Sequence, residues 1–356
     1  MNISTKNKIF LCCLIASASA ACSKVAFNPV ENDSSSLTPN KSVSSSEIVA
    51  YGNKQVDFLL VLDDSNSMLQ DLKKLAARMS GFVSSLDASN IDWQMCLTTT
   101  RGLSSNGSLF YGVPKAWNNH SPADGNNYLL KKGAANLDAV FTTTVDTMTI
   151  GGSNSGDERG IKAAFENFNI ANSHDCYRPG AAISVILISD EDERSVGGDP
   201  SNVKANDASG SYQPLEVEDR PENLISKAQA VFGTDVRFTF NSIIVKPGDA
   251  ICETEQDKDT SPSHPGYVYA EASRLTEGGV GSICDADYSA NLNTFKDKIV
   301  NSLTQLVLTC VPVPDSLSVK INGQAVTDIK LDKKILKFKK ALIEGTKIDL
   351  KYDCVN

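Results

Sequence analysis

The chain has little of the chemistry that marks a nucleic-acid or carbohydrate binder. Only 7% of its 356 residues are aromatic, and these are scattered rather than grouped into stacking platforms. The formal net charge is −9, with acidic and basic residues mixed along the chain and no long basic run. Because a protein that binds a phosphate backbone needs a net basic face, we expect no nucleic-acid partner.

The chain also lacks the short motifs from which many catalytic sites are recognised. It contains no G-x-S-x-G, no phosphate-binding loop and no H-E-x-x-H. The three histidines, His120, His174 and His264, stand far apart in predicted loops, where we expect surface positions. No cysteine pair has C-x-x-C spacing, which argues against zinc and thioredoxin-like chemistry. We therefore expect no catalytic residues and a protein that is not an enzyme.

Residues 1–21 have the features of a secretion signal. Lys6 and Lys8 precede an apolar run at 9–16, and small residues then lead to Cys22. The apolar run is too short to span a bilayer as a permanent helix. We therefore expect this segment to be removed on export.

The end of the signal is similar to a lipobox, the site at which bacterial lipoproteins are acylated. In Ser19-Ala20-Ala21-Cys22, Cys22 would carry the lipid, although Ser19 stands where Leu is usual. Ser23 resembles the default for the outer membrane of Gram-negative bacteria. We expect an exported protein, lipid-anchored in the cell envelope at that membrane, with the lipid as its only membrane contact. Ordinary cleavage near Ala20 or Ala21, giving a soluble exported protein, is the alternative.

Six cysteines follow Cys22, an even number in a compartment that favours disulfides. Fifteen connectivities are formally possible. We favour Cys310 with Cys354, which bracket the C-terminal segment, Cys252 with Cys284, which flank one predicted helix, and, by elimination, Cys96 with Cys176.

Residues 22–53 are dominated by Ser, Asn, Lys and Pro, and contain too little apolar surface to offset the entropy of ordering. They predict a flexible Ser-rich linker. Such a tether would hold the folded body away from a lipid surface.

From residue 54 the chain alternates between apolar strands and amphipathic helices. The run at 56–62 is almost continuously apolar, as in a parallel strand covered on both faces. The predicted strands are 56–62, 91–99, 182–189, 238–245 and 281–284, and the predicted helices are 69–86, 157–169, 221–232, 267–275 and 292–306. The alternation predicts an α/β fold over 54–310, a doubly wound, mostly parallel sheet flanked by helices. Polar insertions at about 191–220 and 247–265 are either decorative loops or binding surface.

The sequence pattern changes after Pro312 and Pro314, from long strands and helices to short apolar segments. Short apolar segments at 317–321, 325–329, 335–338 and 348–352 alternate with turns, and Asn322-Gly323 is a hairpin signal. We expect a small all-β module over 311–356.

Oxygen-bearing side chains follow three of the predicted βα units. They are Asp63, Ser65 and Ser67 after the strand 56–62, Ser153 in the Gly-rich loop 151–156, and Asp190 after the strand 182–189. Because ligands bind beyond the carboxyl ends of strands in open α/β sheets, we expect these residues to meet. Their hard oxygen atoms suit Mg²⁺, or Mn²⁺ or Ca²⁺. The D-x-S-x-S spacing alone is weak, because Asp and Ser also cap helices.

With these residues the chain resembles the von Willebrand factor A domain and its metal ion-dependent adhesion site. That site combines D-x-S-x-S, a Thr or Ser in a Gly-rich loop, and an Asp from a TDG-like turn. The resemblance implies that the metal ligands are Asp63, Ser65, Ser67, Ser153 and Asp190. Glu191 follows Asp190 where Gly is usual. Segments at 155–165, 186–193 and 275–285 look like a group of von Willebrand A lipoproteins from Gram-negative, often predatory, bacteria, and the resemblance covers roughly 54–356.

The resemblance implies a cation with one open coordination position, which would bind a protein partner through an Asp or Glu carboxylate. A binding or adhesion protein is therefore the favoured function. One alternative is a structural or assembly protein of the envelope that uses the fold as a scaffold. Another is a hydrolase, for which Asp64 and Glu191 are candidate bases.

Two acidic stretches invite further interpretation. Glu191, Asp192 and Glu193 would extend the metal site, but a charge run is more typical of a solvated face. The acidic stretch at 249–259 lacks EF-hand spacing, so we expect no second calcium site there.

Overall fold

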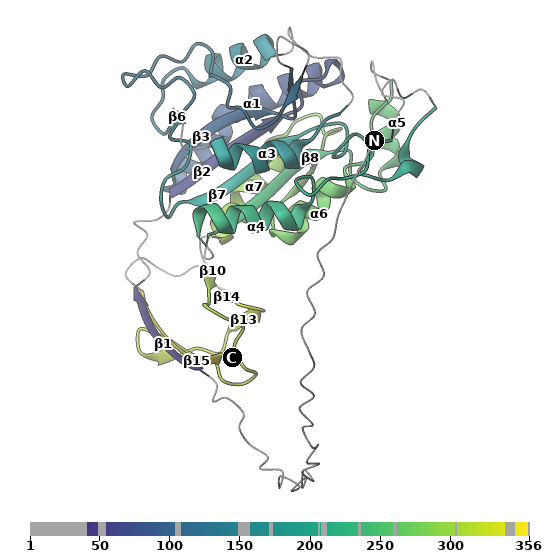
Figure 1. Cartoon of the computed structure of the whole chain (residues 1–356). Helices are drawn as coiled ribbons and strands as arrows, with labels where there is room; N and C mark the ends of the chain where they lie inside the picture. Colours follow the sequence, from purple (N-terminus) through teal and green to yellow (C-terminus); the bar gives the residue numbers. More distant parts are fainter. Residues whose placement is uncertain are drawn as a thin grey trace, which may run out of the picture. The chain divides into compact units, whose positions relative to one another are not determined.

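A computed structural model describes residues 41–48, 55–103, 108–148, 157–170, 174–205, 207, 212–233, 236–258, 262–302, 305–338 and 346–354. Its centre is a six-stranded sheet in the order β6-β3-β2-β7-β8-β9 (Figure 1). The strands are β2 (Gln55–Leu62), β3 (Asp92–Thr99), β6 (Leu130–Lys131), β7 (Ala182–Ile188), β8 (Phe238–Ile244) and β9 (Val280–Ser282).

All neighbouring strands of this sheet are parallel except β3 and the edge strand β6, which are antiparallel. Numbered along the chain, the six strands have the order 3-2-1-4-5-6, which is that of a doubly wound α/β fold. The predicted fold class is therefore confirmed. The order places β2 and β7 side by side in the middle of the sheet.

Helices cover both faces of the sheet (Figure 1). The core on one face contains side chains from α1 (Leu69–Ala88), α2 (Leu137–Met148) and α7 (Ser289–Ser302). The core on the other face contains side chains from α3 (Gly160–Ile170), α4 (Pro221–Phe232) and α6 (Tyr267–Leu275). Both faces of β2 are buried, which explains its mostly apolar sequence.

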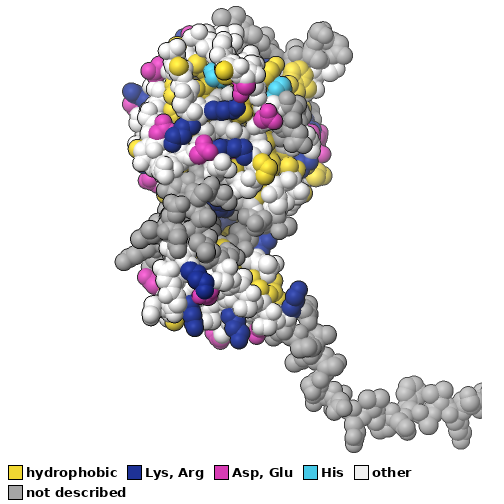
Figure 2. Space-filling model, turned by 90° about the vertical axis from the view of Figure 1, so that its left-hand side faces the viewer, with side chains coloured by type: hydrophobic (Ala, Val, Ile, Leu, Met, Phe, Trp, Pro, Cys, Tyr) yellow, Lys and Arg dark blue, Asp and Glu magenta, His cyan; other side chains and the backbone are white. Residues whose placement is uncertain are grey.

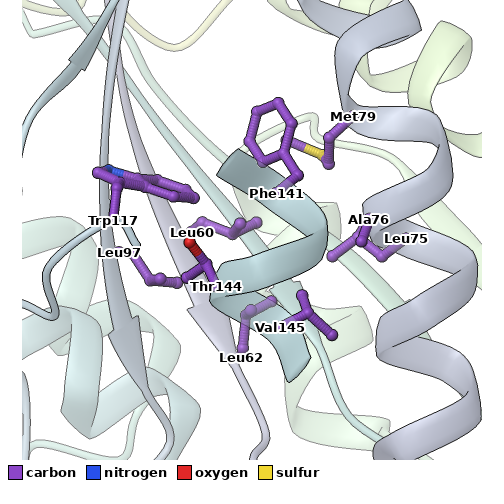
Figure 3. A pocket seen from close by; sticks show the side chains of 10 residues that line it. All are labelled: Leu60, Leu62, Leu75, Ala76, Met79, Leu97, Trp117, Phe141, Thr144 and Val145. Carbon is purple, nitrogen blue, oxygen red and sulfur yellow. The ribbon is translucent and has the colours of Figure 1, made fainter. Parts of the chain in front are cut away.

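A small cavity of about 10 Å³ lies between the sheet and helices α1 and α2 (Figure 3). It is lined by Leu60, Leu62, Leu75, Ala76, Met79, Leu97, Trp117, Phe141, Thr144 and Val145. The polar groups of the lining residues are satisfied elsewhere, because the Thr144 hydroxyl donates to the Val140 carbonyl at 2.6 Å and the Trp117 indole N–H donates to the Met95 carbonyl at 3.2 Å. A space this small and apolar has no partners for a water molecule, and it is a packing gap rather than a ligand site.

Several elements differ from those that the sequence predicted. Helix α2 was not predicted, and α5 (Ala250–Gln256) lies within the polar insertion at 247–265. The helix predicted at 292–306 is wrong at its end, because α7 stops at Ser302 and β10 (Gln305–Val307) pairs with a distant strand. The remaining short elements are β4 (Gly102–Leu103), β5 (Leu109–Phe110) and two 3₁₀ turns, Asn66–Met68 and Pro200–Asn202.

A separate antiparallel part contains two small sheets. One has the order β1-β15-β11-β12 and the other β10-β14-β13. Their strands are β1 (Lys41–Ile48), β11 (Ser318–Ile321), β12 (Gln324–Ala325), β13 (Ile329–Asp332), β14 (Ile335–Phe338) and β15 (Lys347–Cys354), together with β10. Asn322 and Gly323 have φ of 48° and 81°, as the predicted hairpin turn between β11 and β12 requires.

Strand β1 corrects the predicted linker. Residues 41–48, expected within a flexible segment at 22–53, pair with β15 over their whole length. The reason is that a β15 edge offers unpaired backbone groups, which a polar segment can satisfy without burying much of its own surface. The expected signal at 1–21, Cys22 and the rest of the linker, 22–40 and 49–53, lie outside the described residues.

Three disulfides join the pairs that the sequence favoured, Cys96–Cys176, Cys252–Cys284 and Cys310–Cys354. Among the described residues no helix combines the length and apolarity needed to cross a membrane. On the face seen in Figure 2, acidic and basic side chains are interspersed, without a continuous basic area.

Candidate metal centre

The carboxyl ends of β2 and β7 lie next to each other at one edge of the sheet. The two strands are parallel, with Leu62 opposite Ile188, and the Asp63 N–H donates to the Ile188 carbonyl at 3.1 Å. The helix after β2 packs on one face of the sheet and α4, after β7, packs on the other. This is the switch point at which open α/β sheets bind their ligands.

Asp63 and the two serines after it form a compact turn. The Asp63 side chain is fully buried, and its Oδ1 accepts from the Ser65 N–H at 2.9 Å. Its Oδ2 accepts from the Ser189 hydroxyl at 2.7 Å, which ties the turn to the end of β7. The hydroxyl oxygens of Ser65 and Ser67 lie 3.0 Å apart. Neither Ser65, before the 3₁₀ turn, nor Met68, before α1, makes a side-chain cap, so helix capping does not account for these serines.

Asp190 lies at the end of the neighbouring strand and is 1% exposed. Neither of its carboxylate oxygens accepts a well-formed hydrogen bond from the described residues. Burial, followed by the Asp63 and Glu191 carboxylates, raises the pKa of Asp190 well above its usual range, against the effect of the nearby Ser67 hydroxyl. A buried carboxylate in this position is costly without a cation.

Two further oxygen atoms at this edge are buried without a partner in the described part of the chain, Asp64 Oδ1 and Thr100 Oγ1. The Thr100 N–H donates to the Leu62 carbonyl at 2.9 Å, which places Thr100 level with Asp63. Burial, and then Asp63, raises the pKa of Asp64 to about 6. The edge is therefore rich in hard oxygen atoms and in buried negative charge, and it fits a divalent cation.

The predicted ligand set comes together only in part. Asp63, Ser65, Ser67 and Asp190 share this edge, whereas Ser153 lies outside the described residues. No cluster of three or more His, Cys, Asp or Glu side chains that could hold a metal is found among the described residues. A cation here would depend on serine hydroxyls as well as on the two carboxylates.

The acidic run after Asp190 is buried, so the predicted solvated face is wrong. Asp192 accepts from the Val268 N–H, at 3.0 Å to Oδ1, at the start of α6. Glu193 accepts from the N–H groups of Ile161 and Lys162, at 2.7 and 3.0 Å, at the start of α3. The first N–H groups of a helix have no partner within the helix, and these carboxylates supply one. The sequence alone could not predict this capping role, because it depends on the starts of two helices packing against one loop.

Glu191 instead lies close enough to Asp63 for the two carboxylates to repel each other. It is 7% exposed, and burial, followed by the Asp63 carboxylate, raises its pKa to about 8. The nearby Ser195 hydroxyl opposes this rise in pKa. Glu191 thus adds a fourth carboxyl to an edge that already holds Asp63, Asp64 and Asp190.

His264 is also buried, contrary to the expected surface position. Its side chain is 1% exposed, with Nε2 3.4 Å from Asp207 Oδ2, and burial lowers its pKa. Its backbone N–H donates to the Asp190 carbonyl at 2.9 Å. The insertion that carries His264 therefore supports the metal edge directly.

The two polar insertions bind each other through Lys204. Its Nζ lies 2.8 Å from both Asp257 Oδ1 and Glu253 Oε1, and 2.6 Å from the Ser263 carbonyl. Much of the acidity at 249–259 is thus paired within the protein.

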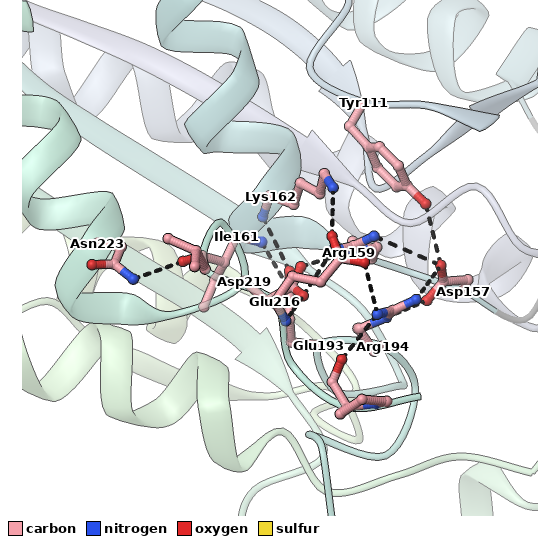
Figure 4. A network of polar contacts seen from close by, with 12 residues as sticks. Tyr111, Asp157, Arg159, Ile161, Lys162, Glu193, Arg194, Glu216, Asp219 and Asn223 are labelled. Atoms are coloured by element: carbon pink, nitrogen blue, oxygen red, sulfur yellow. Dashed lines mark hydrogen bonds and ion pairs between the residues drawn. The ribbon is translucent and has the colours of Figure 1, made fainter. Parts of the chain in front are cut away.

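A polar network holds the start of α3, which follows the Gly-rich sequence 151–156 (Figure 4). Arg159 makes two hydrogen bonds of 2.7 Å to Asp219 and one of 2.6 Å to Glu216. Arg194 binds Asp157 Oδ1 at 2.9 Å. The sequence offered no specific signal for these pairs, because their partners lie about 40 to 60 positions apart.

Comparisons with known proteins give weak similarities in structure alone. No family model matches the chain, and no curated protein matches it in sequence. Solved structures similar to it include the pilus adhesin SpaC of Lactobacillus rhamnosus GG in an open conformation (14% identity, TM-score 0.35), the human COPII-coat protein Sec24c (11%, 0.41) and the manganese-loaded TRAP protein of Plasmodium vivax (14%, 0.33).

Each of these matches covers 88% of this chain. The match spans 40% of SpaC and 41% of Sec24c, so the chain corresponds to less than half of either, and it spans 97% of TRAP. Similarities this weak carry no argument about function. The fold class rests on the strand order, and the candidate site rests on its own side chains.

Proposed function

We propose that this protein binds a divalent cation at the carboxyl ends of β2 and β7 and, through it, an acidic group of a protein partner. Asp63, Ser65, Ser67 and Asp190 would hold the cation together with Ser153. The observation that carries the proposal is the buried Asp190 carboxylate, which accepts no well-formed hydrogen bond from the described residues and lies beside Asp63 and two adjacent serine hydroxyls. Mg²⁺, Mn²⁺ and Ca²⁺ all prefer such oxygen ligands.

The composition of the site favours binding over catalysis. When bound, the cation would supply an electrophilic position for a carboxylate oxygen of the partner. Two carboxylates and three hydroxyls leave a divalent cation short of strong negative ligands, so an additional anionic oxygen binds well. The chain's own residues would orient the cation and exclude water from all but one side.

We also propose that the protein works in the cell envelope of a Gram-negative bacterium. Its sequence supports export and acylation at Cys22, and three disulfides suit an oxidising compartment. The chain would then act as a receptor, adhesin or assembly factor at the outer membrane.

Calorimetry of the purified chain with Mg²⁺, Mn²⁺ and Ca²⁺ tests the cation, and pull-down from envelope extracts with Mg²⁺ or with EDTA tests the partner. Asp63→Ala should abolish uptake of the cation and the Mg²⁺-dependent capture. Asp92→Ala, at the amino end of β3, is a control that should leave both intact. If Asp63→Ala lowers the melting temperature but captures the same partner, the protein is instead a scaffold that uses the fold without metal-dependent binding.

A further inference from the structure

A buried ion pair lies beside the proposed cation site, between the end of β3 and the start of α3. The Arg101 guanidinium contacts the Glu158 carboxylate, and each side chain is 1% exposed. The Ser195 hydroxyl donates to Glu158 Oε2 at 3.2 Å, and the Arg194 N–H donates to the Glu158 carbonyl at 2.6 Å. Glu158 is therefore fixed in position by the loop that follows β7.

The backbone also ties the two halves of the pair together. The Arg159 N–H, next to Glu158, donates to the carbonyl of Thr100, next to Arg101, at 3.2 Å. Thr100 in turn binds the end of β2 through the Leu62 carbonyl. Thr100 lies level with Asp63, and Arg101 is the next residue along the chain. The backbone thus holds Arg101 near the metal edge.

Arg101 is close enough to the metal edge to act on its acids. Its positive charge lowers the pKa of both Asp64 and Glu191, although burial and Asp63 outweigh it. A guanidinium stays charged at all relevant pH values. Inside a protein, a nearby positive charge weakens the binding of a cation, unless an acidic partner neutralises that charge.

We infer that Glu158 is a positioning residue for the cation site, because it holds and neutralises the Arg101 guanidinium that would otherwise pair with the carboxylates of the metal edge. This inference rests on the proposed function. Without Glu158, Arg101 would serve as an internal counter-ion for Asp64, Glu191 and their neighbours. The divalent cation would then have to compete with a permanent positive charge.

A double-mutant cycle on the purified chain tests this role. Glu158→Gln keeps the shape of the side chain and should weaken Mg²⁺ binding about tenfold or more by calorimetry. Arg101→Met combined with Glu158→Gln removes both charges and should restore the affinity to within about threefold of the wild type. Such rescue distinguishes an electrostatic role from a structural one, because the double variant loses more native contacts than the single.

A second buried ion pair supplies the control. Asp57, fully buried in the amino half of β2, lies 2.6 Å from Arg178. Asp57→Asn and Glu158→Gln should both lower the melting temperature in EDTA, but Asp57→Asn should leave the Mg²⁺ affinity unchanged. Circular dichroism and the melting temperature in EDTA show whether each variant is folded.

The outcomes separate the inference from the proposed function. If the wild type takes up none of the three cations, the proposed function fails and the inference fails with it. If the wild type binds Mg²⁺ while Glu158→Gln binds it equally well, or while the double variant is as weak as the single, the inference alone is overturned. Should Glu158→Gln not fold, a tenfold loss of affinity in a folded double variant would overturn it as well.

Discussion

Among single residues, Asp190 has the least favourable surroundings of the proposed ligands. Its two oxygens are buried without a well-formed hydrogen bond from the described residues, and Asp63 and Glu191 add negative charge nearby. The cation-free protein must therefore hold either a proton or an uncompensated charge at this position. Removing that charge and removing the cation should have opposite effects on stability.

Asp190→Asn tests this opposition. In EDTA the variant should equal or exceed the wild type in free energy of unfolding, by up to about 2 kcal/mol, because a buried charge is gone. With Mg²⁺ at about a hundred times its dissociation constant, the wild type should gain about 2.7 kcal/mol and the variant nothing. Urea unfolding under both conditions measures this. A variant that Mg²⁺ stabilises as much as the wild type would contradict the assignment of Asp190 as a ligand.

Glu216 provides a prediction that depends on pH. Hydrogen bonds from Arg159 and then Lys162 lower its pKa to about 2. Since the folded-state value lies below the unfolded one, its contribution to stability is present above about pH 4.5 and is lost as the pH falls toward about 2. The side chain is 47% exposed, so the contribution is about 1 kcal/mol or less after screening. Glu216→Gln should cost this amount at pH 7 and clearly less at pH 3, by urea unfolding. A difference that stays constant with pH would contradict the ion pairs.

At this scale the sequence predicted the residues that end buried strands. Asp63 and Asp190 each come after a mostly apolar run, so their place at the sheet edge can be predicted from the strand pattern. Burial of Glu193 or His264 could not be predicted in the same way. Their surroundings are helix ends and insertions that come from other parts of the chain.

Among the elements, the long apolar strands and amphipathic helices were predicted well, and α2 was missed. Its sequence, LDAVFTTTVDTM, contains four threonines and two aspartates, which are poor helix formers. Packing of Val140 and Phe141 into the core stabilises it instead. Helix propensity therefore could not predict α2, because tertiary contacts stabilise it.

Glu193 supports an element from a distance, and its loss should be costly. Glu193→Ala leaves the N–H groups of Ile161 and Lys162 buried without an acceptor, which should lower the free energy of unfolding by about 2 to 4 kcal/mol. Guanidinium unfolding measures this loss. Glu255→Ala removes an exposed acid paired with Lys258 and should cost less than about 0.5 kcal/mol. Equal effects of the two substitutions would rule out the capping role.

For the whole molecule, the main surprise is that residues 41–48 complete a sheet whose other strands come from the C-terminal part of the chain. Val43 packs, half-buried, against the small core that contains Leu350 and Tyr352. Ser45 is also half-buried, whereas Lys41, Ser42, Ser44 and Ser46 are exposed. Backbone hydrogen bonds to β15, rather than hydrophobic burial, hold most of the strand.

Hydrogen exchange tests the placement of β1. Val43→Asp places a charge against the small core and should cost about 1 to 3 kcal/mol locally. Amides of β1 and β15 should then exchange faster, while those of β2 and β7 keep their protection. Ser44→Asp, on the exposed side of the same strand, is the control and should leave exchange unchanged. Rapid exchange of β1 amides in the wild type would overturn the pairing.

The sequence by itself determined the α/β class, most strands and helices, and the position of four candidate ligands, because these depend on apolar periodicity and on the residues directly after a buried strand. Only the tertiary structure decided that β1 joins β15, that consecutive acids cap two different helices, and that Arg101 meets Glu158. These contacts join segments that are distant in the chain. Their energy depends on burial and on partners brought together by folding, and no local pattern of residues specifies either.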